Sequence, residues 1–230
     1  MVLKFEHFAD FGTGEPFVAR IVGLSDLINI TNFKNKKEVS DSILTIFMEG
    51  LSPAFLSLKE IRAIEKGEKQ KILLNLTKNY YNLFDHLWIA YKDRTQKASK
   101  IMGVDIGFIF QNDEKFQRNA VKFLKNNPKM NSCFVSALES ERKVWQNLLS
   151  LIRNNYLQHQ EIDYEKVKQY FNLKIAEMQF ERCWLAIEFI LVSIIEKNMI
   201  KGIGLEEIPE SERDIANPKR YRTILIGHIV

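Results

Sequence analysis

The sequence predicts an all-α protein built as an antiparallel helical bundle, and three observations support this fold class. The composition of the 230 residues, with 46% hydrophobic and 27% charged residues, is that of an ordinary folded domain. Apolar residues recur at helical spacing through long segments. The glycines and prolines fall between these segments, and no Asn-Gly or Asp-Gly dipeptide signals a β-hairpin.

The N-terminal third is the least regular part of the chain. Glycines and a proline interrupt residues 1–34, so that Val18 to Leu24 fits either a strand or a short helix. Residues 37–48 show helical spacing, and Gly50 with Pro53 predicts the end of this first helix. A Ser57/Glu60 capping box then predicts a short helix ending near Gly67.

The longest predicted helices lie in the rest of the chain. Residues 69–102 carry an apolar stripe that includes Leu73, Leu76, Tyr80, Phe84, Leu87 and Tyr91, with Trp88 beside it. Further helices are predicted from Asp113 to about Asn127, from Ser136 to about His159, from Asp163 to Phe171 and from Leu173 to Asn198. Such stripes can be buried only against one another, which predicts the bundle.

Three parts follow from this pattern. Residues 1–66 form an N-terminal extension that packs on the bundle, residues 67–202 form the bundle itself, and residues 203–230 form a C-terminal tail. The tail is polar until its apolar end, Thr223 to Val230, so an arm that docks through its last residues is one interpretation.

Charge and cysteine content point to a cytoplasmic protein without excluding a polyanionic partner. The formal net charge is +4, from 33 basic and 29 acidic residues. Cys133 and Cys183 have apolar neighbours and no CxxC pattern, which indicates buried thiols in a reducing compartment. The N-terminus lacks an export signal, and the strongest apolar run, Cys183 to Ile195, is too short to span a membrane and contains Glu188. We therefore expect no membrane association.

Familiar catalytic motifs are absent from the sequence. It contains no Gly-rich phosphate loop, no GxSxG, no HExxH and no Glu-x-x-His pair. The four histidines, His7, His86, His159 and His228, are isolated from one another. We therefore expect neither a metal nor a cofactor.

One segment has the residue types of a catalytic site. Arg153 and Asn154 are followed by His159 near the end of a predicted helix, giving the pattern R-N-x4-H. This pattern resembles the motif of the HEPN families (higher eukaryotes and prokaryotes nucleotide-binding domains). In those families an Arg, a polar residue and a His lie near the end of a core helix of an all-helical bundle. The resemblance covers about residues 70–200, including the long helix after the motif.

The resemblance implies a function, partners and a site. Many HEPN proteins are metal-independent endoribonucleases, often toxins of toxin–antitoxin or antiphage defence systems, and they act as dimers. For this chain it implies RNA as substrate, a homodimer, an antitoxin protein as a partner, and Arg153, Asn154 and His159 as catalytic residues.

The residue types suit this chemistry. A histidine with a pKa near 6.5 exchanges protons at neutral pH while the RNA 2′-hydroxyl attacks the adjacent phosphate. Arg153 would stabilise the charge that develops on that phosphate, and the Asn154 amide would orient the histidine or the phosphate. This route leaves a 2′,3′-cyclic phosphate.

Two alternatives stay open. Residues six apart on a continuous helix are separated by about 120° around its axis, so the helix must end between Arg153 and His159 or the site must be composite across a dimer axis. The three residues are equally suited to ordinary C-terminal helix capping. The chain would then be a non-catalytic helical module that binds RNA or protein, or a purely structural bundle.

Two further patterns bear on the site. Residues 115–182 contain twelve basic and seven acidic residues, a net charge of +5 that is compatible with an RNA backbone. The aromatic residues of the 69–102 helix have the spacing of a core stripe rather than of a base-stacking platform. We assign no role to the adjacent Asp85 and His86, because neighbouring helical residues point apart.

Overall fold

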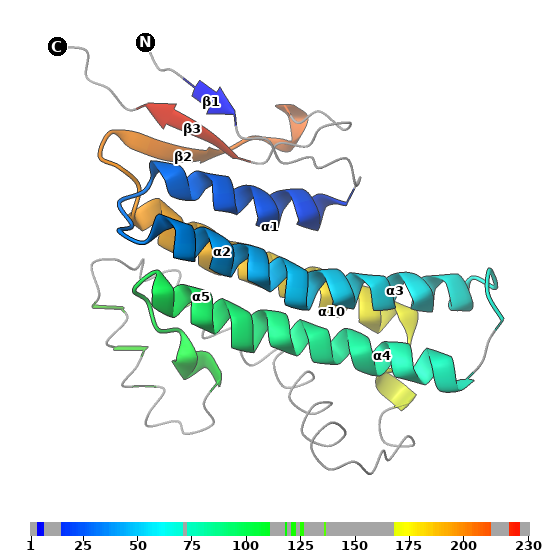
Figure 1. The fold of residues 1–230 in the computed structure, drawn as a ribbon. Coiled ribbons are helices and arrows are strands. Elements are labelled where there is room, and N and C mark those ends of the chain that lie inside the picture. Colours follow the sequence, from blue (N-terminus) through cyan, green and yellow to red (C-terminus); the bar gives the residue numbers. More distant parts are fainter. Residues whose placement is uncertain are drawn as a thin grey trace.

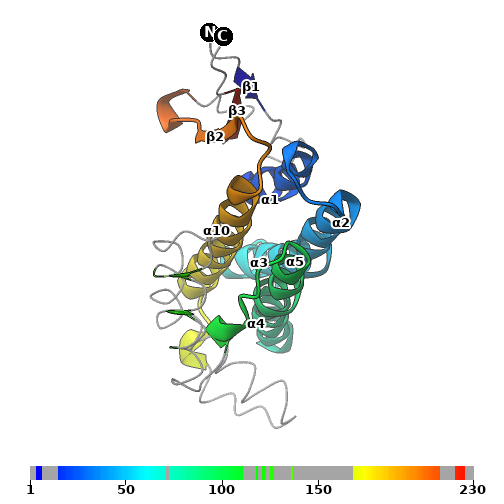
Figure 2. The same cartoon turned by 90° about the vertical axis from the view of Figure 1, so that its left-hand side faces the viewer.

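The computed structural model describes most of the chain outside the predicted motif. The described residues are 4–6, 15–70, 73–110, 118, 121–122, 125–126, 136, 168–212 and 221–225. They include long helices and a small sheet (Figures 1 and 2). In chain order the helices are α1 (Pro16–Leu27), η1 (Ile28–Ile30), α2 (Lys36–Ile46), η2 (Phe47–Leu51), α3 (Ser52–Glu65), α4 (Leu73–Trp88), η3 (Ile89–Arg94), α5 (Thr95–Ile101), η4 (Gly107–Phe110), η6 (Lys168–Tyr170), α10 (Leu173–Lys197) and η7 (Glu210–Glu212).

The first long helix does not stop at Gly50 and Pro53, so the prediction of two separate helices is wrong here. The elements α2, η2 and α3 form one continuous helix of 30 residues, Lys36–Glu65. The segment η2 is a π-helical turn, in which the backbone N–H of Ser52 donates to the carbonyl of Phe47 five residues earlier. Pro53 follows directly after this turn, at the start of α3, and the helix continues past it.

Two further predicted helices, those over residues 69–102 and 173–198, are confirmed. The helices predicted from Asp113 to about Asn127, from Ser136 to about His159 and from Asp163 to Phe171 lie mostly outside the described residues. The elements α4, η3 and α5 run from Leu73 to Ile101 with a second π-helical turn, and α10 begins at Leu173 as predicted. The Asn172 side chain caps α10 by accepting a hydrogen bond from the backbone N–H of Ile175 at 2.9 Å. Gly67 and Gly103 have φ of 76° and 85° just after α3 and α5, which is why glycine ends both helices.

Contacts along α10 give the directions of the helices. Phe17 and Arg20 of α1 contact Phe180 and Glu188 in the same order, so α1 and α10 run parallel. On α3 the order is reversed, because Phe55 contacts Phe180 whereas the later Arg62 contacts Glu177. The bundle is therefore antiparallel between α3 and α10 and parallel between α1 and α10 (Figure 1).

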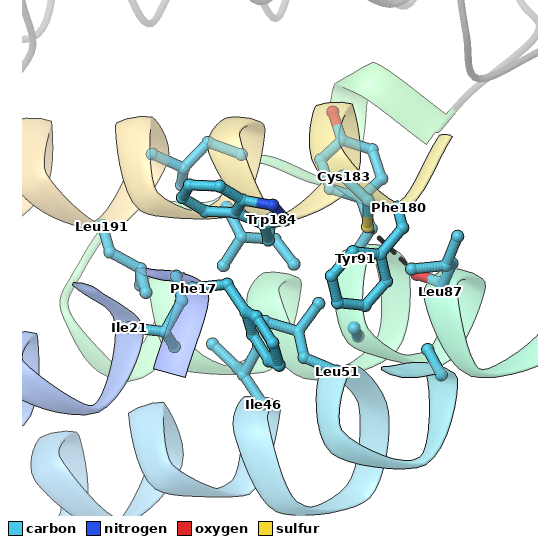
Figure 3. Packing of buried hydrophobic residues seen from close by; sticks show 14 of the residues in the cluster. Phe17, Ile21, Ile46, Leu51, Leu87, Tyr91, Phe180, Cys183, Trp184 and Leu191 are labelled. Carbon is cyan, nitrogen blue, oxygen red and sulfur yellow. Dashed lines mark hydrogen bonds between the residues drawn. The ribbon is translucent and has the colours of Figure 1, made fainter. Parts of the chain in front are cut away.

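One hydrophobic core joins all of these helices. Phe17 and Ile21 of α1 lie between α10 and the α2–α3 helix, next to Ile46 and Leu51 (Figure 3). The core continues into α4, whose Tyr80, Phe84, Leu87, Trp88 and Tyr91 are buried as the predicted stripe requires. Leu73 is the exception: it is 58% exposed, because it lies in the first turn of α4 at the end of the bundle.

The structure adds a small sheet that the sequence analysis did not predict. β1 (Lys4–Glu6), β2 (Ile203–Glu207) and β3 (Tyr221–Leu225) form a three-stranded antiparallel sheet with β3 in the centre. The register pairs Phe5 with Thr223 and Thr223 with Leu205. The described chain is thus mainly helical, and the predicted tail contributes two strands, of which β3 pairs with the N-terminal strand β1 on one side and with β2 on the other.

The predicted three-part division stays a prediction, and the core crosses its first boundary. The α3–α4 contact lies across the turn at Gly67, and α1 packs on α10, so residues on both sides of position 66 share one core. Asn32 on the α1–α2 connection also crosses the first boundary, because its backbone N–H donates to the Asn198 carbonyl at 2.7 Å and its amide to the Met199 carbonyl at 3.0 Å. Val18 to Leu24, which fitted a strand or a helix, lies in α1.

By length and composition alone, the Lys36–Glu65 helix meets the criterion for a membrane span within the described part of the chain. Core helices of water-soluble proteins also meet it. Val39, Ile43, Ile46 and Leu58 of this helix are fully buried in the protein core.

Candidate functional site

The three residues of the predicted catalytic motif, Arg153, Asn154 and His159, lie outside the described residues. Cys133 also lies outside them. The structure describes the element that follows the motif, the long helix α10, and several charged residues of the surrounding segment.

Five basic residues of the predicted cationic segment are described and exposed to solvent: Arg118, Lys122, Lys125, Lys174 and Arg182. The first three have helical spacing, and the described residues among 118–125 have helical backbone. Exposure leaves these charges accessible to a polyanion, as the ribonuclease interpretation requires.

The most deeply buried ion pair of the described residues joins α1 to α10. The Arg20 Nε donates to Glu188 Oε1 at 2.8 Å, and a second guanidinium nitrogen bonds Oε2. The Arg20 guanidinium also lies over the Trp184 ring, with its Cζ 4.2 Å from the ring centroid. The Glu188 side chain is 3% exposed and that of Arg20 12%. Because both carboxylate oxygens bond the guanidinium, this carboxylate is committed to structure rather than to proton transfer.

Sequence reasoning noted Glu188 in an apolar run but missed its partner. A single carboxylate among buried apolar residues signals that a cation must lie nearby, since an unpaired buried charge is very costly. The partner Arg20 is 168 residues away in the chain. Only the tertiary structure identifies it.

The two π-helical turns lie against each other at the centre of the bundle. A Cβ added to Gly50 in η2 would lie 2.4 Å from the Cβ of Ala90 in η3, so the two backbones approach very closely. The buried Thr95 hydroxyl donates to the Ala90 carbonyl at 2.7 Å. Arg94 and Glu49 form an ion pair between the same two turns. π-helical turns often occur at functional sites. The described contacts here join the two turns to each other, and the Arg94 Nε is buried without a hydrogen-bond partner among the described residues.

The aromatic residues of α4 are core residues, as predicted. Phe171, just before α10, stacks on Tyr80 with ring centroids 5.0 Å apart and meets Tyr81 edge-on at 5.1 Å. Tyr80 and Tyr81 are 1% and 8% exposed. These rings pack against other protein rings, so they do not form a stacking platform for bases.

The remaining reactive side chains lie apart from one another. His86 is partly buried, and its Nδ1 has no hydrogen-bond partner among the described residues. Cys183 is fully buried, and its Sγ lies 3.6 Å from the Leu87 carbonyl (Figure 3). Burial raises the pKa of this thiol well above its ordinary value, so it stays protonated and is a poor nucleophile.

Metal and small-molecule sites find little support in the described residues. No group of three or more His, Cys, Asp and Glu side chains there could hold a metal ion.

A shallow depression of about 620 Å³ lies at the start of α2, lined by Phe33, Lys34, Asn35, Lys36, Lys37, Glu38 and Asp41. Three of its polar side chains are engaged with protein groups: Lys36 Nζ donates to the Asn29 carbonyl at 2.8 Å, and Asn35 Nδ2 donates to Glu38 Oε2 at 3.0 Å.

Comparison with known proteins does not identify a relative: no family model, no curated protein and no solved structure matches this chain.

Proposed function

We propose that this protein is a metal-independent endoribonuclease of the HEPN type, acting in toxin–antitoxin or antiphage defence. The observation that carries the proposal is the R-N-x4-H pattern of Arg153, Asn154 and His159 in a mainly helical chain. The antitoxin would be a protein partner and the active form a homodimer.

The position of the motif relative to α10 supports the proposal. In the families that the motif resembles, a second long helix follows the motif helix. Here α10 starts at Leu173, shortly after His159, and runs for 25 residues through the core. A buried helix that follows the motif in the sequence would give catalytic groups a rigid support.

Each motif residue has a defined task in this reaction. His159 would take the proton of the 2′-hydroxyl or deliver one to the leaving 5′-oxygen. Arg153 would bond the phosphate oxygens, on which charge accumulates in the transition state, with a guanidinium that stays charged. Asn154 would orient the imidazole or the phosphate through its amide. The exposed basic residues Arg118, Lys122 and Lys174 supply charge that attracts the RNA backbone.

The proposal is tested by incubating the purified protein with mixed RNA in excess EDTA and analysing the fragment ends. We expect cleavage that leaves 2′,3′-cyclic phosphate ends and that Arg153→Ala or His159→Ala reduces by about 100-fold or more, the typical loss when an acid–base or oxyanion group is removed. Asn154→Ala should give a smaller loss.

Matched control variants separate the site from general damage. His86→Gln removes a histidine and Lys97→Ala an exposed charge, both at described positions that do not belong to the motif, and both should retain cleavage. Thermal melts establish that every variant is folded. Intact RNA with the wild-type protein, or cleavage that survives both motif substitutions, would contradict the proposal. RNA binding without cleavage would instead favour a non-catalytic helical binding module.

A further inference from the structure

A row of solvent-exposed side chains runs along the outside of the long Lys36–Glu65 helix, which lies in front of the other helices in Figure 1. Met48 and Leu56 are 64% and 60% exposed, and Leu44 is partly exposed. Single exposed apolar residues are common, but a row of them on one helix face indicates contact with a partner. We call the row the α2–α3 outer face: Asp41, Leu44, Met48, Ser52, Leu56 and Lys59.

The π-helical turn η2 brings this row into line. On an uninterrupted α-helix, residues eight positions apart differ by about 80° around the axis. The π-helical turn closes its hydrogen bond over five residues instead of four, so the helix after it is rotated back. This rotation turns Leu56 toward the side on which Met48 lies, and both are well exposed in the structure.

The outer face carries charge at its two ends. Between Asp41 and Lys59 the sequence has one charged residue, Glu49, and its carboxylate is paired with Arg94 of η3. Asp41 and Lys59 are both exposed and form no ion pair with another described residue. The Lys59 Nζ lies 5.9 Å from the centroid of the Phe55 ring on its own helix. The face is therefore apolar in the middle, acidic at one end and basic at the other.

These residues are arranged symmetrically about Gly50. Asp41 and Lys59 each lie nine positions from it, and Leu44 and Leu56 each lie six positions from it. If a second copy of the helix lies antiparallel on the first, with the two-fold axis at Gly50, Asp41 of each copy comes opposite Lys59 of the other. Leu44 comes opposite Leu56 in the same register. A surface that is complementary to itself in this way is what a two-fold dimer requires.

The same register avoids like charges along the rest of the helix. Glu38 comes opposite Arg62, and Lys37 comes opposite Ala63. The distance from one charged end to the other is about 27 Å, over which two helices that cross at about 20° stay in contact. A parallel pair would instead place Asp41 against Asp41 and Lys59 against Lys59, which is unfavourable.

The charges favour a second copy over the other possible occupants. An anionic lipid surface would repel the Asp41 carboxylate, and a nucleic acid would meet an apolar surface with a single lysine at one end. A second copy supplies a cation opposite Asp41 and an anion opposite Lys59, and it covers the apolar middle with the same apolar side chains.

We propose that a second copy of this chain packs antiparallel on the α2–α3 outer face, forming a two-fold dimer in which Asp41–Lys59 ion pairs flank an apolar centre of Leu44, Met48 and Leu56. The ribonuclease proposal calls for a homodimer but names no interface, and this interface is argued from the helix face alone. One helix pair is small beside the standard interface of about 800 Å² per partner, so the dimer should dissociate at micromolar concentrations.

Sedimentation velocity of the full chain at concentrations from about 1 to about 100 μM, the range expected for a small interface, tests the dimer. The mass should rise from the 27.0 kDa of one chain toward twice that value. Met48→Glu with Leu56→Glu should raise the Kd by about 10-fold or more, because it places charge in the apolar centre. The matched control is Leu74→Glu, at a residue that is 76% exposed on α4, and it should leave the mass unchanged.

Charge reversals test the register. Asp41→Lys places a lysine opposite Lys59, and Lys59→Asp places an aspartate opposite Asp41. Each change alone should raise the Kd by about 10-fold, with a smaller effect at high salt. An equimolar mixture of the two variants should dimerise about as tightly as the wild type, because every lysine at the interface then lies opposite an aspartate.

Each outcome decides for or against this interface. Thermal melts should show all variants folded, because the substituted side chains are exposed. A wild-type chain that stays monomeric would overturn the proposal, as would a dimer that survives Met48→Glu with Leu56→Glu. Charge-reversal variants that do not restore each other would overturn the register, and a monomer that binds phosphatidylserine vesicles through Met48 and Leu56 would assign the face to lipid. The readout here is mass, whereas the ribonuclease proposal is judged by RNA fragment ends, so the two can fail separately.

Discussion

Two Arg–Glu ion pairs join α10 to its neighbours. They share one hydrogen bond of the same length but differ in how exposed their side chains are to solvent. Glu188 bonds Arg20 of α1, and Glu177 bonds Arg62 of α3. Each arginine donates its Nε to the carboxylate Oε1 at 2.8 Å. The side chains of the first pair are 3% and 12% exposed, whereas those of the second are 44% and 36% exposed.

The comparison shows that the length of the hydrogen bond does not decide how much an ion pair contributes to the stability of the fold. Near the surface, water screens the charges and solvates either partner when the other is removed, so the pair contributes little. In the interior the surviving partner cannot be solvated, and the protein depends on both being present. Glu188 and Glu177 should therefore differ strongly when each is removed.

The largest effect is expected from Glu188→Ala. Removing the carboxylate leaves the Arg20 charge buried beside Trp184, and the free energy of unfolding should fall by about 3–5 kcal/mol. Urea denaturation followed by circular dichroism measures the change. A loss below about 1 kcal/mol would mean that water reaches Arg20 and that the two ion pairs are equivalent.

The joint replacement of Arg20→Met and Glu188→Leu sharpens this test. It removes both charges and keeps apolar volume, so it should restore most of the stability that Glu188→Ala loses. Restoration would assign the loss to an uncompensated charge rather than to a cavity. A double variant as unstable as Glu188→Ala would assign the loss to packing.

An uncharged buried contact, that between Gly50 and Ala90, should give an effect of intermediate size on the free energy of unfolding. In Gly50→Ala the new methyl group would meet Ala90 at 2.4 Å, so the two π-helical turns must move apart. We expect a loss of about 1–3 kcal/mol in the free energy of unfolding. The combined variant with Ala90→Gly should recover only a small part of the loss. It removes the nearest methyl group, but the Ala90 Cα and backbone N would still lie 2.6 and 2.9 Å from the new methyl group. No recovery would show that the backbone contact itself is limiting.

The smallest effect is expected at the exposed pair. Arg62→Ala and Glu177→Ala should each lower the free energy of unfolding by about 1 kcal/mol or less, and raised salt should shrink the difference from wild type. The same denaturation series measures both variants. A loss comparable to that of Glu188→Ala would show that the half-exposed pair is as poorly solvated as the buried one.

Most of the described helices could be predicted because apolar periodicity is a local property. The stripe from Leu76 to Tyr91 and the start of α10 after Asn172 follow directly from residue spacing and a cap. The end predicted at Gly50 and Pro53 was wrong because a π-helical turn carries the chain past both residues. Gly50 serves the contact with Ala90, which no local pattern contains.

Local sequence patterns could predict neither the sheet nor the geometry of the candidate site. β1 and β3 are separated by more than two hundred residues and are too short for an alternating pattern to be distinctive. For the site, the sequence supplies the residue types Arg153, Asn154 and His159 and their spacing. Their chemistry follows from the side chains, whereas a shared active site requires a geometry that spacing does not contain.

The sequence by itself determined where the long helices α4 and α10 lie and which of their faces are apolar, because these properties depend on neighbours a few positions away. The tertiary structure alone decided that Glu188 meets Arg20, that Gly50 meets Ala90, and that the two ends of the chain share a sheet. These pairings join distant residues, and they form only when the burial of many apolar side chains at once offsets the entropy of closing the loops between them.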